Sequence, residues 1–317
     1  MRYIRQIIFE KIGEEKQKLI EKSVVSVVGV GALGTIVSEL LVRAGVRKLI
    51  LVDRDIIELN NLQRQSLFCE EDVNKLKALV AKEKLEKINS KVKIDAHAVD
   101  LDYKNIDIIK SNLVIDCSDN FETRFLINDF CLKEKIPWIY GAVIGSYGIT
   151  LNIIPKKTPC FRCVFKEPTK LLGTCDTEGI VNTIPHAIAG MQVTEAIKML
   201  TKSVYNREMI YYDIWKNKIT KTKINRLSSC PSCNGKYEYL EGKSQDVVKM
   251  CGTKRYQIKG MIFDFRELID RFEKLDKVKL TDHCLFFKDF IVFRDGRVLV
   301  NANSKEQAKS LYDKYLG

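Results

Sequence analysis

The 317-residue chain is 45% hydrophobic and 30% charged, a composition typical of an ordinary soluble protein large enough to bury a sizeable core. Its net charge of +12 is spread along the sequence with Lys and Glu interleaved, so we expect a solvated surface and no nucleic-acid groove. No apolar run approaches the roughly 18 residues of a membrane helix, and the N-terminus lacks the apolar core of a signal peptide, which together predict a cytoplasmic protein.

The first half of the chain alternates short apolar runs with segments of helical periodicity. The expected strands cover residues 24–28, 49–52, 92–98, 113–116, 138–140 and 147–154, and the expected helices cover 14–22, 35–44, 73–88 and 121–134. Strands that alternate with helices in this way form parallel sheets with helices on both faces. We therefore predict an α/β fold with a Rossmann-like, doubly wound, mainly parallel sheet.

The second half of the chain changes character twice. Residues 156–185 are rich in Pro and Gly and are expected to be irregular; a helix over 187–201 and paired antiparallel strands over 209–224 follow. After about residue 240 we expect helices over 263–275 and 304–315, with strands at 284–287, 290–293 and 298–301. The predicted domains are thus residues 1–240 and a small α+β appendage, 241–317, of unknown role.

A complete Gly-rich loop, Gly29-Val30-Gly31-Ala32-Leu33-Gly34, lies between an expected strand and helix. In that context, missing side chains let a phosphate approach the backbone and the positive end of the helix. Asp53 ends the next strand 19 residues after Gly34, where its carboxylate can accept hydrogen bonds from ribose hydroxyls. The loop suits NAD, FAD or ATP equally, and a tight turn without any ligand is the remaining alternative.

Three cations and an amide lie outside the loop. Asn61 and Arg64 come shortly after the second strand, Lys77 is in the next helix, and Arg5 is near the N-terminus. Separate cations suit a triphosphate whose charge moves to a pyrophosphate leaving group better than they suit a dinucleotide. Each cation taken alone is more typical of a surface residue.

A carboxylate-rich segment, Asp116-Cys117-Ser118-Asp119-Asn120, ends another buried strand. Side chains at the carboxyl ends of parallel strands face the ligand crevice, where a carboxylate can hold magnesium through the phosphates. Capping of the following helix is the alternative role.

Four of the ten cysteines form two matched pairs, Cys160-x-x-Cys163 and Cys230-x-x-Cys233. Four thiolates suit a closed, tetrahedral and structural Zn²⁺ site. Because 66 residues separate the pairs, the metal would clip two distant parts of one domain and pin the segment 156–185 against the strands before residue 230. We expect core or incidental roles for a further five cysteines: Cys69, Cys117, Cys131, Cys251 and Cys284.

Residues 1 to about 235 resemble one family, the MoeB/ThiF/HesA adenylyltransferases, which are relatives of ubiquitin-activating enzymes. The motifs that carry the resemblance, by their order and spacing, are Arg2-Tyr3-x-Arg5-Gln6, Gly29-x-Gly31-x-x-Gly34, Asp53-x-Asp55, Asn61-Leu62-Gln63-Arg64-Gln65, Asp116-Cys117-Ser118-Asp119-Asn120 and the two cysteine pairs. The resemblance implies an enzyme that uses Mg·ATP to adenylate the C-terminal glycine of a small β-grasp protein, either ubiquitin-like or a sulfur carrier (MoaD-, ThiS- or Urm-like).

The resemblance also implies residue roles. Asp53 would bind the ribose, and Asp119 the magnesium ion. The phosphates would be bound by Asn61, Arg64 and Lys77. Asp55 and Asn120 belong to the same motifs and are expected in the nucleotide site. Arg5 matches an arginine that family members donate to the partner subunit's active site, which implies a homodimer.

Cys175 stands where the family often carries a reactive cysteine. Two roles are possible for Cys175. It could form a thioester or a persulfide-linked adduct with the carrier, or the enzyme could adenylate the carrier without using this thiol. Neighbouring Asp176 and Glu178 disfavour its thiolate. We expect the appendage not to be a sulfurtransferase domain like that of some eukaryotic relatives, so a persulfide donor would be a separate protein. Molybdopterin, thiamine, tRNA thiolation and protein conjugation pathways all use this chemistry, and the sequence does not choose between them.

Two other functions stay open. An NAD-dependent oxidoreductase shares the Gly-rich loop but leaves Arg64, Lys77, Asp119 and the cysteine pairs without a role. A non-catalytic zinc or nucleic-acid-binding scaffold would use the +12 charge and would need none of the nucleotide motifs.

Overall fold

The computed structural model describes residues 2–166, 178–243, 247–249, 255–259, 261–281 and 283–316. The chain divides into two compact units, Met1–Lys243 and Ser244–Gly317. The elements of the first unit are α1 (Ile4–Ile8), α2 (Gly13–Ile20), β1 (Val24–Val28), α3 (Ala32–Ala44), β2 (Lys48–Val52), η1 (Leu59–Asn61), η2 (Glu70–Asp72), α4 (Lys77–Ile88), β3 (Lys93–His97), η3 (Ile106–Ile109), β4 (Leu113–Asp116), α5 (Phe121–Glu134), β5 (Trp138–Ile144), β6 (Tyr147–Ile153), α6 (Phe161–Val164), α8 (Thr183–Leu200), β7 (Met209–Asp213), β8 (Lys218–Thr222), η4 (Ser232–Asn234) and η5 (Glu238–Glu241).

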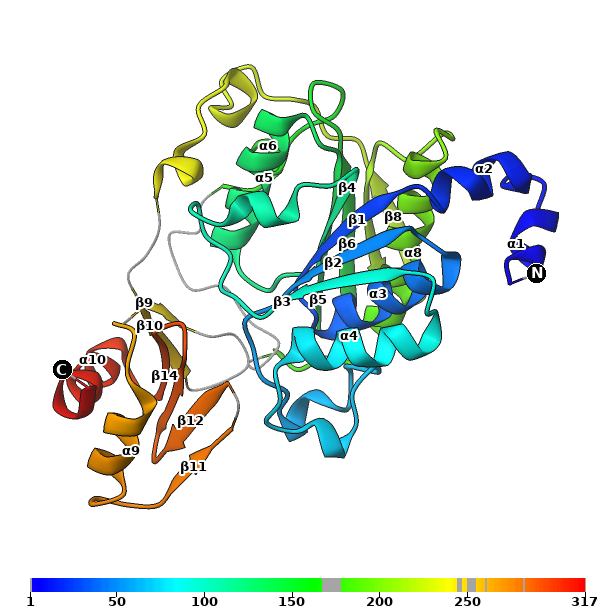
Figure 1. Cartoon of the computed structure of the whole chain (residues 1–317). Coiled ribbons are helices and arrows are strands. Elements are labelled where there is room, and N and C mark those ends of the chain that lie inside the picture. The colour runs from blue at the N-terminus through cyan, green and yellow to red at the C-terminus, as the bar shows by residue number, and fades with distance from the viewer. Residues whose placement is uncertain are drawn as a thin grey trace. The chain divides into compact units, whose positions relative to one another are not determined.

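The first unit is built on an eight-stranded sheet in the order β3-β2-β1-β4-β5-β6-β7-β8 (Figure 1). Strands β1 to β5 run parallel, and β6, β7 and β8 extend the sheet antiparallel. The chain order reverses direction at β1, which places the topological switch point of a doubly wound sheet between β1 and β4. The expectation of a large, mainly parallel sheet is confirmed.

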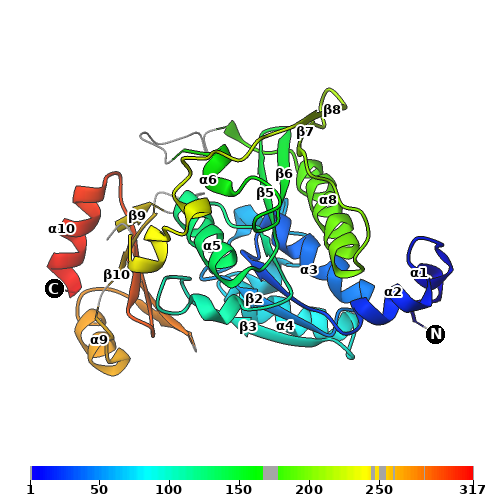
Figure 2. The same ribbon diagram turned by 90° about the horizontal axis from the view of Figure 1, so that it is seen from above.

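Two apolar clusters cover the two faces of this sheet. One joins the sheet to α3, α4 and α8, and the other joins it to α5 and α6, as Figures 1 and 2 show. Strands β1, β2 and β4 are buried along almost their whole length because both faces are covered. No helix within the described residues is both long enough and apolar enough to cross a membrane.

Three element boundaries in the first unit differ by four residues from the sequence prediction. Strand β5 extends to Ile144 because it pairs with β6 over its whole length. Helix α4 begins at Lys77, not at residue 73, because η2 and a turn at Asn74, with a positive φ of 72°, occupy the preceding residues. Helix α8 begins at Thr183 and holds Pro185 in its first turn, where a proline removes no intrahelical hydrogen bond. The short helix α1 was not predicted.

The second unit is a six-stranded antiparallel sheet in the order β11-β12-β13-β14-β10-β9. Its elements are β9 (Val247–Lys249), β10 (Arg255–Lys259), α9 (Phe265–Phe272), β11 (Val278–Leu280), β12 (Cys284–Phe287), β13 (Phe290–Phe293), β14 (Arg297–Asn301) and α10 (Lys305–Leu316). Both helices pack on the sheet through one apolar cluster, in which the rings of Phe272 and Phe287 stack 4.0 Å apart. Strands β9, β10 and β11 were not predicted.

Candidate functional site

The loop after β1 is packed so closely that two of its three motif glycines admit no side chain. A Cβ at Gly29 would lie 2.5 Å from the backbone oxygen of Cys117, and one at Gly34 would lie 1.9 Å from the backbone oxygen of Gly29. Gly29 also has a positive φ of 89°. A Cβ at Gly31 would meet only the Gln65 amide nitrogen, at 3.8 Å. Gly29 and Gly34 are thus required by the fold, whereas Gly31 leaves space beside the loop for a ligand.

Asp53 at the end of β2 holds this loop in place. One carboxylate oxygen accepts a hydrogen bond from the Val30 backbone N–H at 2.6 Å, and the other accepts from the Asp55 N–H at 2.7 Å. Burial raises the pKa of Asp53 to about 6, with Asp55 adding to the shift and Lys77 opposing it. Each carboxylate oxygen can accept a further hydrogen bond, so these contacts leave acceptor capacity for a ribose.

Lys77 is a buried cation at the start of α4. Its side chain is 8% exposed, and Nζ lies 3.1 Å from a carboxylate oxygen of Asp55. Burial by itself favours the neutral amine, but the carboxylates of Asp55 and Asp53 hold the pKa of Lys77 above its ordinary value. The site therefore keeps a desolvated positive charge close to the Gly-rich loop, where electrostatic interactions are strong.

Asn61 and Arg64 lie together on the chain that leaves β2. The Arg64 guanidinium donates to the Asn60 carbonyl at 2.8 Å, and the Asn61 amide donates to the Asn60 side chain at 2.6 Å. Arg64 is half-buried. The neighbouring Gln65 is 4% exposed and faces Gly31, since its amide nitrogen would lie 3.8 Å from a Cβ built there. Its amide oxygen has no hydrogen-bond partner among the described residues. Sequence reasoning quoted Gln65 within a motif and gave it no role.

Asp119 follows β4, on the opposite side of the switch point from the end of β2. It is exposed, and its carboxylate is close enough to act on the charges of Arg54 and Lys77. The side chain of Asn120 caps α5 by accepting from the Thr123 N–H at 2.8 Å, so Asp119 is not the helix cap.

Arg54 was not predicted as a site residue. Its guanidinium donates to Asp100 at 2.7 Å. Although burial alone would lower the pKa of Arg54, the carboxylates of Asp100, Asp55 and Asp119 hold it above the ordinary value. Its position directly after Asp53, at the carboxyl end of a parallel strand, is a signal that could have identified it.

Arg124, also missed, shapes the segment that carries Asp119. Its Nε lies 3.5 Å from the fully buried carboxylate of Asp116, and its Nη2 donates to the Ser118 carbonyl at 2.6 Å. The guanidinium lies 5.6 Å from the Phe121 ring centre and 5.2 Å from that of Tyr140. Burial raises the pKa of Asp116 to about 6, and Arg124 opposes the shift. A charged residue on a predicted helix is ordinarily assigned to the surface, which is why it was overlooked.

Arg5 is not brought to this cluster. Helix α1 is fastened to the C-terminal end of α3: the Tyr3 ring packs on Gly45, its hydroxyl accepts from Asn89 at 2.9 Å, and the Gln6 amide donates to the Ala44 carbonyl at 3.2 Å. The Gly-rich loop is at the other end of this 13-residue helix, about 20 Å away at 1.5 Å per residue. Arg5 itself is exposed.

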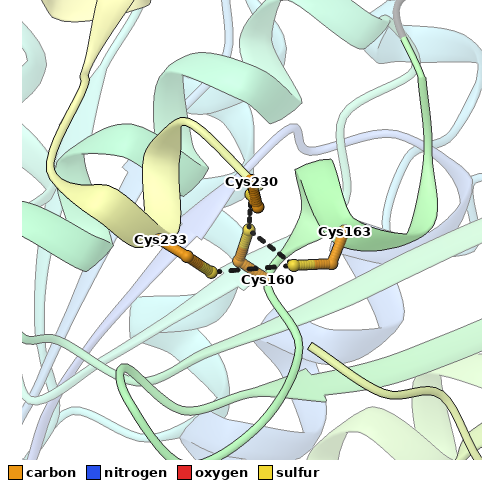
Figure 3. A group of neighbouring side chains, drawn as sticks. All are labelled: Cys160, Cys163, Cys230 and Cys233. Carbon is orange, nitrogen blue, oxygen red and sulfur yellow. Dashed lines mark hydrogen bonds between the residues drawn. The ribbon is translucent and has the colours of Figure 1, made fainter. Parts of the chain in front are cut away.

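The four cysteines of the two pairs converge on one point (Figure 3). The Sγ atoms are 3.7 Å apart for Cys160 and Cys163, 3.5 Å for Cys160 and Cys230, and 3.6 Å for Cys163 and Cys233. Four sulfurs at about 2.3 Å from a tetrahedral zinc ion would be about 3.8 Å from one another, so the group fits this metal.

The surroundings of Cys163 favour a thiolate. Its Sγ accepts from the Leu227 N–H at 3.5 Å, and hydrogen bonds from the Cys160 and Cys233 thiols hold the pKa of Cys163 well below its usual range. Zinc binds cysteine in this ionised form.

The remaining cysteines behave differently from one another. Cys117, Cys131 and Cys284 are buried, as expected. Cys69 is not in apolar surroundings, because the short helix η2 leaves it exposed, with its sulfur 3.1 Å from the Lys84 ammonium. Cys175 and Cys251 lie outside the described residues.

Comparison with known proteins identifies the family. The profile of the ThiF family matches residues 3–232. The chain is 36% identical to the sulfur carrier protein ThiS adenylyltransferase of Bacillus subtilis, over 100% of this chain and 99% of that protein. It is 32% identical to the sulfur carrier protein adenylyltransferase of Thermus thermophilus, over 80% and 97%. The crystal structure of E. coli MccB with ATP has the same fold, with a TM-score of 0.66 at 24% identity over 74% of this chain and 75% of that one. The chain belongs to the ThiF family.

Proposed function

We propose that this protein is an ATP-dependent adenylyltransferase that activates the C-terminal glycine of a small ubiquitin-like or sulfur-carrier protein. The observation that carries the proposal is the buried ammonium of Lys77, held between Asp55 and Asp53 close to the Gly-rich loop. The paired phosphates of a dinucleotide need little charge stabilisation beyond that of such a loop. When a triphosphate loses pyrophosphate, fixed cations stabilise the negative charge that moves to the leaving group. The named activity of the Bacillus subtilis and Thermus thermophilus relatives agrees with it.

Different residues of the site would bind different parts of the ATP molecule. The loop Gly29–Gly34 and the positive end of α3 would hold phosphate oxygens, and Asp53 the ribose. Asn61, Arg64 and Lys77 would bind the remaining phosphates. Asp119 would hold Mg²⁺, which neutralises phosphate charge when bound.

The reaction needs no protein nucleophile. A carboxylate oxygen of the terminal glycine bonds to the α-phosphorus, the bond from that phosphorus to the bridging oxygen breaks, and pyrophosphate leaves with the electron pair. Because negative charge moves toward the leaving group, Arg64 and Lys77 stabilise the transition state more than the ground state. The carboxylate is already ionised, so no general base is required.

Arg5 completes the site of a second subunit in this proposal. Its helix is anchored about 20 Å from the loop of its own chain, so a homodimer is needed to bring it to the phosphates. Mixing inactive Arg5→Ala and Asp119→Ala proteins should restore partial activity in heterodimers, each of which has one intact site. A verified heterodimer that stays inactive would contradict the arrangement.

Transfer of the carrier to Cys175 is a further part of the proposal. The Cys175 thiolate would attack the acyl carbon of the adenylate, the bond from that carbon to the phosphate oxygen would break, and AMP would leave as a thioester forms. A persulfide on Cys175, its outer sulfur supplied by a separate donor protein, would attack in the same way and give an acyl disulfide. Intact-mass analysis of the carrier and enzyme after incubation with ATP separates these outcomes from adenylation alone.

Carrier-dependent exchange of pyrophosphate into ATP tests the proposed function. The natural substrate to use is a β-grasp protein ending in Gly-Gly from the same organism. We expect exchange that requires Mg²⁺ and the carrier and is lost in Asp119→Ala. A purified protein that binds NADH and catalyses no exchange would instead support the oxidoreductase alternative. Nucleic-acid binding that falls steeply with salt and survives Asp119→Ala would support the scaffold alternative.

A further inference from the structure

One side chain of the cysteine site reaches into the core beside α5. Phe161 lies between Cys160 and Cys163 and is fully buried. Its ring centre is 5.1 Å from that of Tyr140 and 6.0 Å from that of Phe121. The first cysteine pair is therefore packed, through this one ring, against both α5 and β5.

The same two rings contact the guanidinium of Arg124, at 5.6 Å from Phe121 and 5.2 Å from Tyr140. Arg124 in turn holds Asp116 through its carboxylate and Ser118 through its carbonyl. Asp119 is the next residue of the chain. A continuous series of packed and hydrogen-bonded groups thus joins the cysteine site to the segment proposed to hold Mg²⁺.

Helix α5 makes a second connection, by hydrogen bonds to both cysteine pairs. The Asn128 side-chain oxygen accepts from the Phe161 N–H at 2.9 Å. The adjacent Asp129 accepts from the Ser232 hydroxyl at 2.6 Å, between Cys230 and Cys233, and from the Tyr239 N–H at 3.2 Å. The N-terminal end of α5 is capped by Asn120, so the helix is tied to the cysteine site near its middle and to the nucleotide site at its N-terminal end.

We infer that metal occupancy of the four-cysteine site and binding of Mg·ATP are coupled through Phe161 and Arg124. A bound metal holds the two cysteine pairs together and keeps Phe161 against Phe121 and Tyr140. Without it the ring contacts loosen, and Arg124 positions the Asp119 segment for a smaller fraction of the time. Phe161 is a positioning residue in this account, since it touches neither nucleotide nor metal. The inference rests on the proposed function in taking Mg·ATP as the ligand.

Coupling between two sites is reciprocal, which gives two independent measurements. Calorimetric titration with a non-hydrolysable Mg·ATP analogue compares full-length protein carrying one zinc ion per chain with protein stripped by a chelator. We expect binding to the stripped protein to be about 2- to 30-fold weaker, the usual range for coupling through packed networks. The rate of zinc release to a chromogenic chelator should fall when the Mg·ATP analogue is present.

A substitution with a matched control removes the dependence on stripped protein. Phe161→Leu keeps all four cysteines and should retain one zinc ion per chain while weakening Mg·ATP binding. Phe272→Leu is the control: it is also a fully buried phenylalanine in an aromatic stack, but it belongs to the second unit and should leave nucleotide affinity unchanged. If the stripped protein loses its near-ultraviolet circular dichroism signal, and with it its tertiary structure, the coupling is tested by comparing the Mg·ATP affinity of zinc-loaded wild type with that of zinc-loaded Phe161→Leu.

The outcomes separate the two proposals. Equal Mg·ATP affinity in zinc-loaded wild type and zinc-loaded Phe161→Leu would overturn the coupling and leave the adenylyltransferase intact. Failure of the zinc-loaded wild type to bind Mg·ATP at all would instead overturn the proposed function.

Discussion

Replacing Gly34 by alanine tests the packing of the nucleotide loop. The new Cβ would lie 1.9 Å from the carbonyl oxygen of Gly29, and because this oxygen is backbone, the loop or α3 must move. Overpacking of a rigid site costs about 1–3 kcal/mol, and each kcal/mol lowers the melting temperature by roughly 2–4 °C in a protein of this size. The displaced loop would also lose its fit to phosphate, so both stability and Mg·ATP affinity should fall.

Gly31→Ala is the matched control, three residues earlier in the same loop. Its Cβ would meet only the flexible side chain of Gln65 at 3.8 Å, so stability should change little while nucleotide affinity falls. Chemical denaturation and calorimetric titration of both variants measure the two effects. Wild-type stability in Gly34→Ala would refute the packing argument, and wild-type affinity in Gly31→Ala would refute the role of the loop in binding phosphate.

Three further predictions concern charge and metal. Lys77→Met should weaken Mg·ATP binding, whereas Lys84→Met, in the same helix but paired with Asp72, should not; equal titration curves for the two variants would remove Lys77 from the site. The pKa of Asp53 is raised from 3.8 to about 6, so Mg·ATP affinity should fall by up to about tenfold per pH unit below pH 6. This part of the pH dependence should be absent from Asp53→Asn. Because the raised pKa belongs to the folded state, the contribution of Asp53 to stability should fall as the pH rises from about 4 to about 6. The difference in unfolding free energy between wild type and Asp53→Asn across this range checks the sign. Cys163→Ser should release the metal and lower the melting temperature, without abolishing the adenylation reaction in molecules that stay folded. A full zinc content in that variant would contradict the metal site.

The sequence predicted best those elements whose signal is local. Strands β1 and β4 and helix α5 have the boundaries expected from continuous apolar runs and from helical periodicity. Helix α1 could not be predicted, because five residues are too few to be stable alone and contacts of Tyr3 and Gln6 with distant residues hold it.

The residues of the candidate site also differ in whether a local sequence pattern identifies them. The four cysteines could be grouped from their spacing, since two C-x-x-C pairs supply the four thiolates of a tetrahedral zinc site. The roles of Arg54 and Arg124 could not be assigned, because their buried partners Asp100, Asp116 and Ser118 are defined only once the strands are placed side by side. From the sequence alone, such charged residues are assigned to the surface, because their burial depends on the tertiary fold.

The most direct test of the account is the intact mass of the β-grasp carrier after incubation with the enzyme, ATP and Mg²⁺. The account predicts an AMP adduct on the carrier's C-terminal glycine with the wild-type enzyme, and none with Asp119→Ala. A carrier whose mass stays unchanged with wild-type enzyme that has bound Mg·ATP, or an equal yield of adduct from Asp119→Ala, would contradict it.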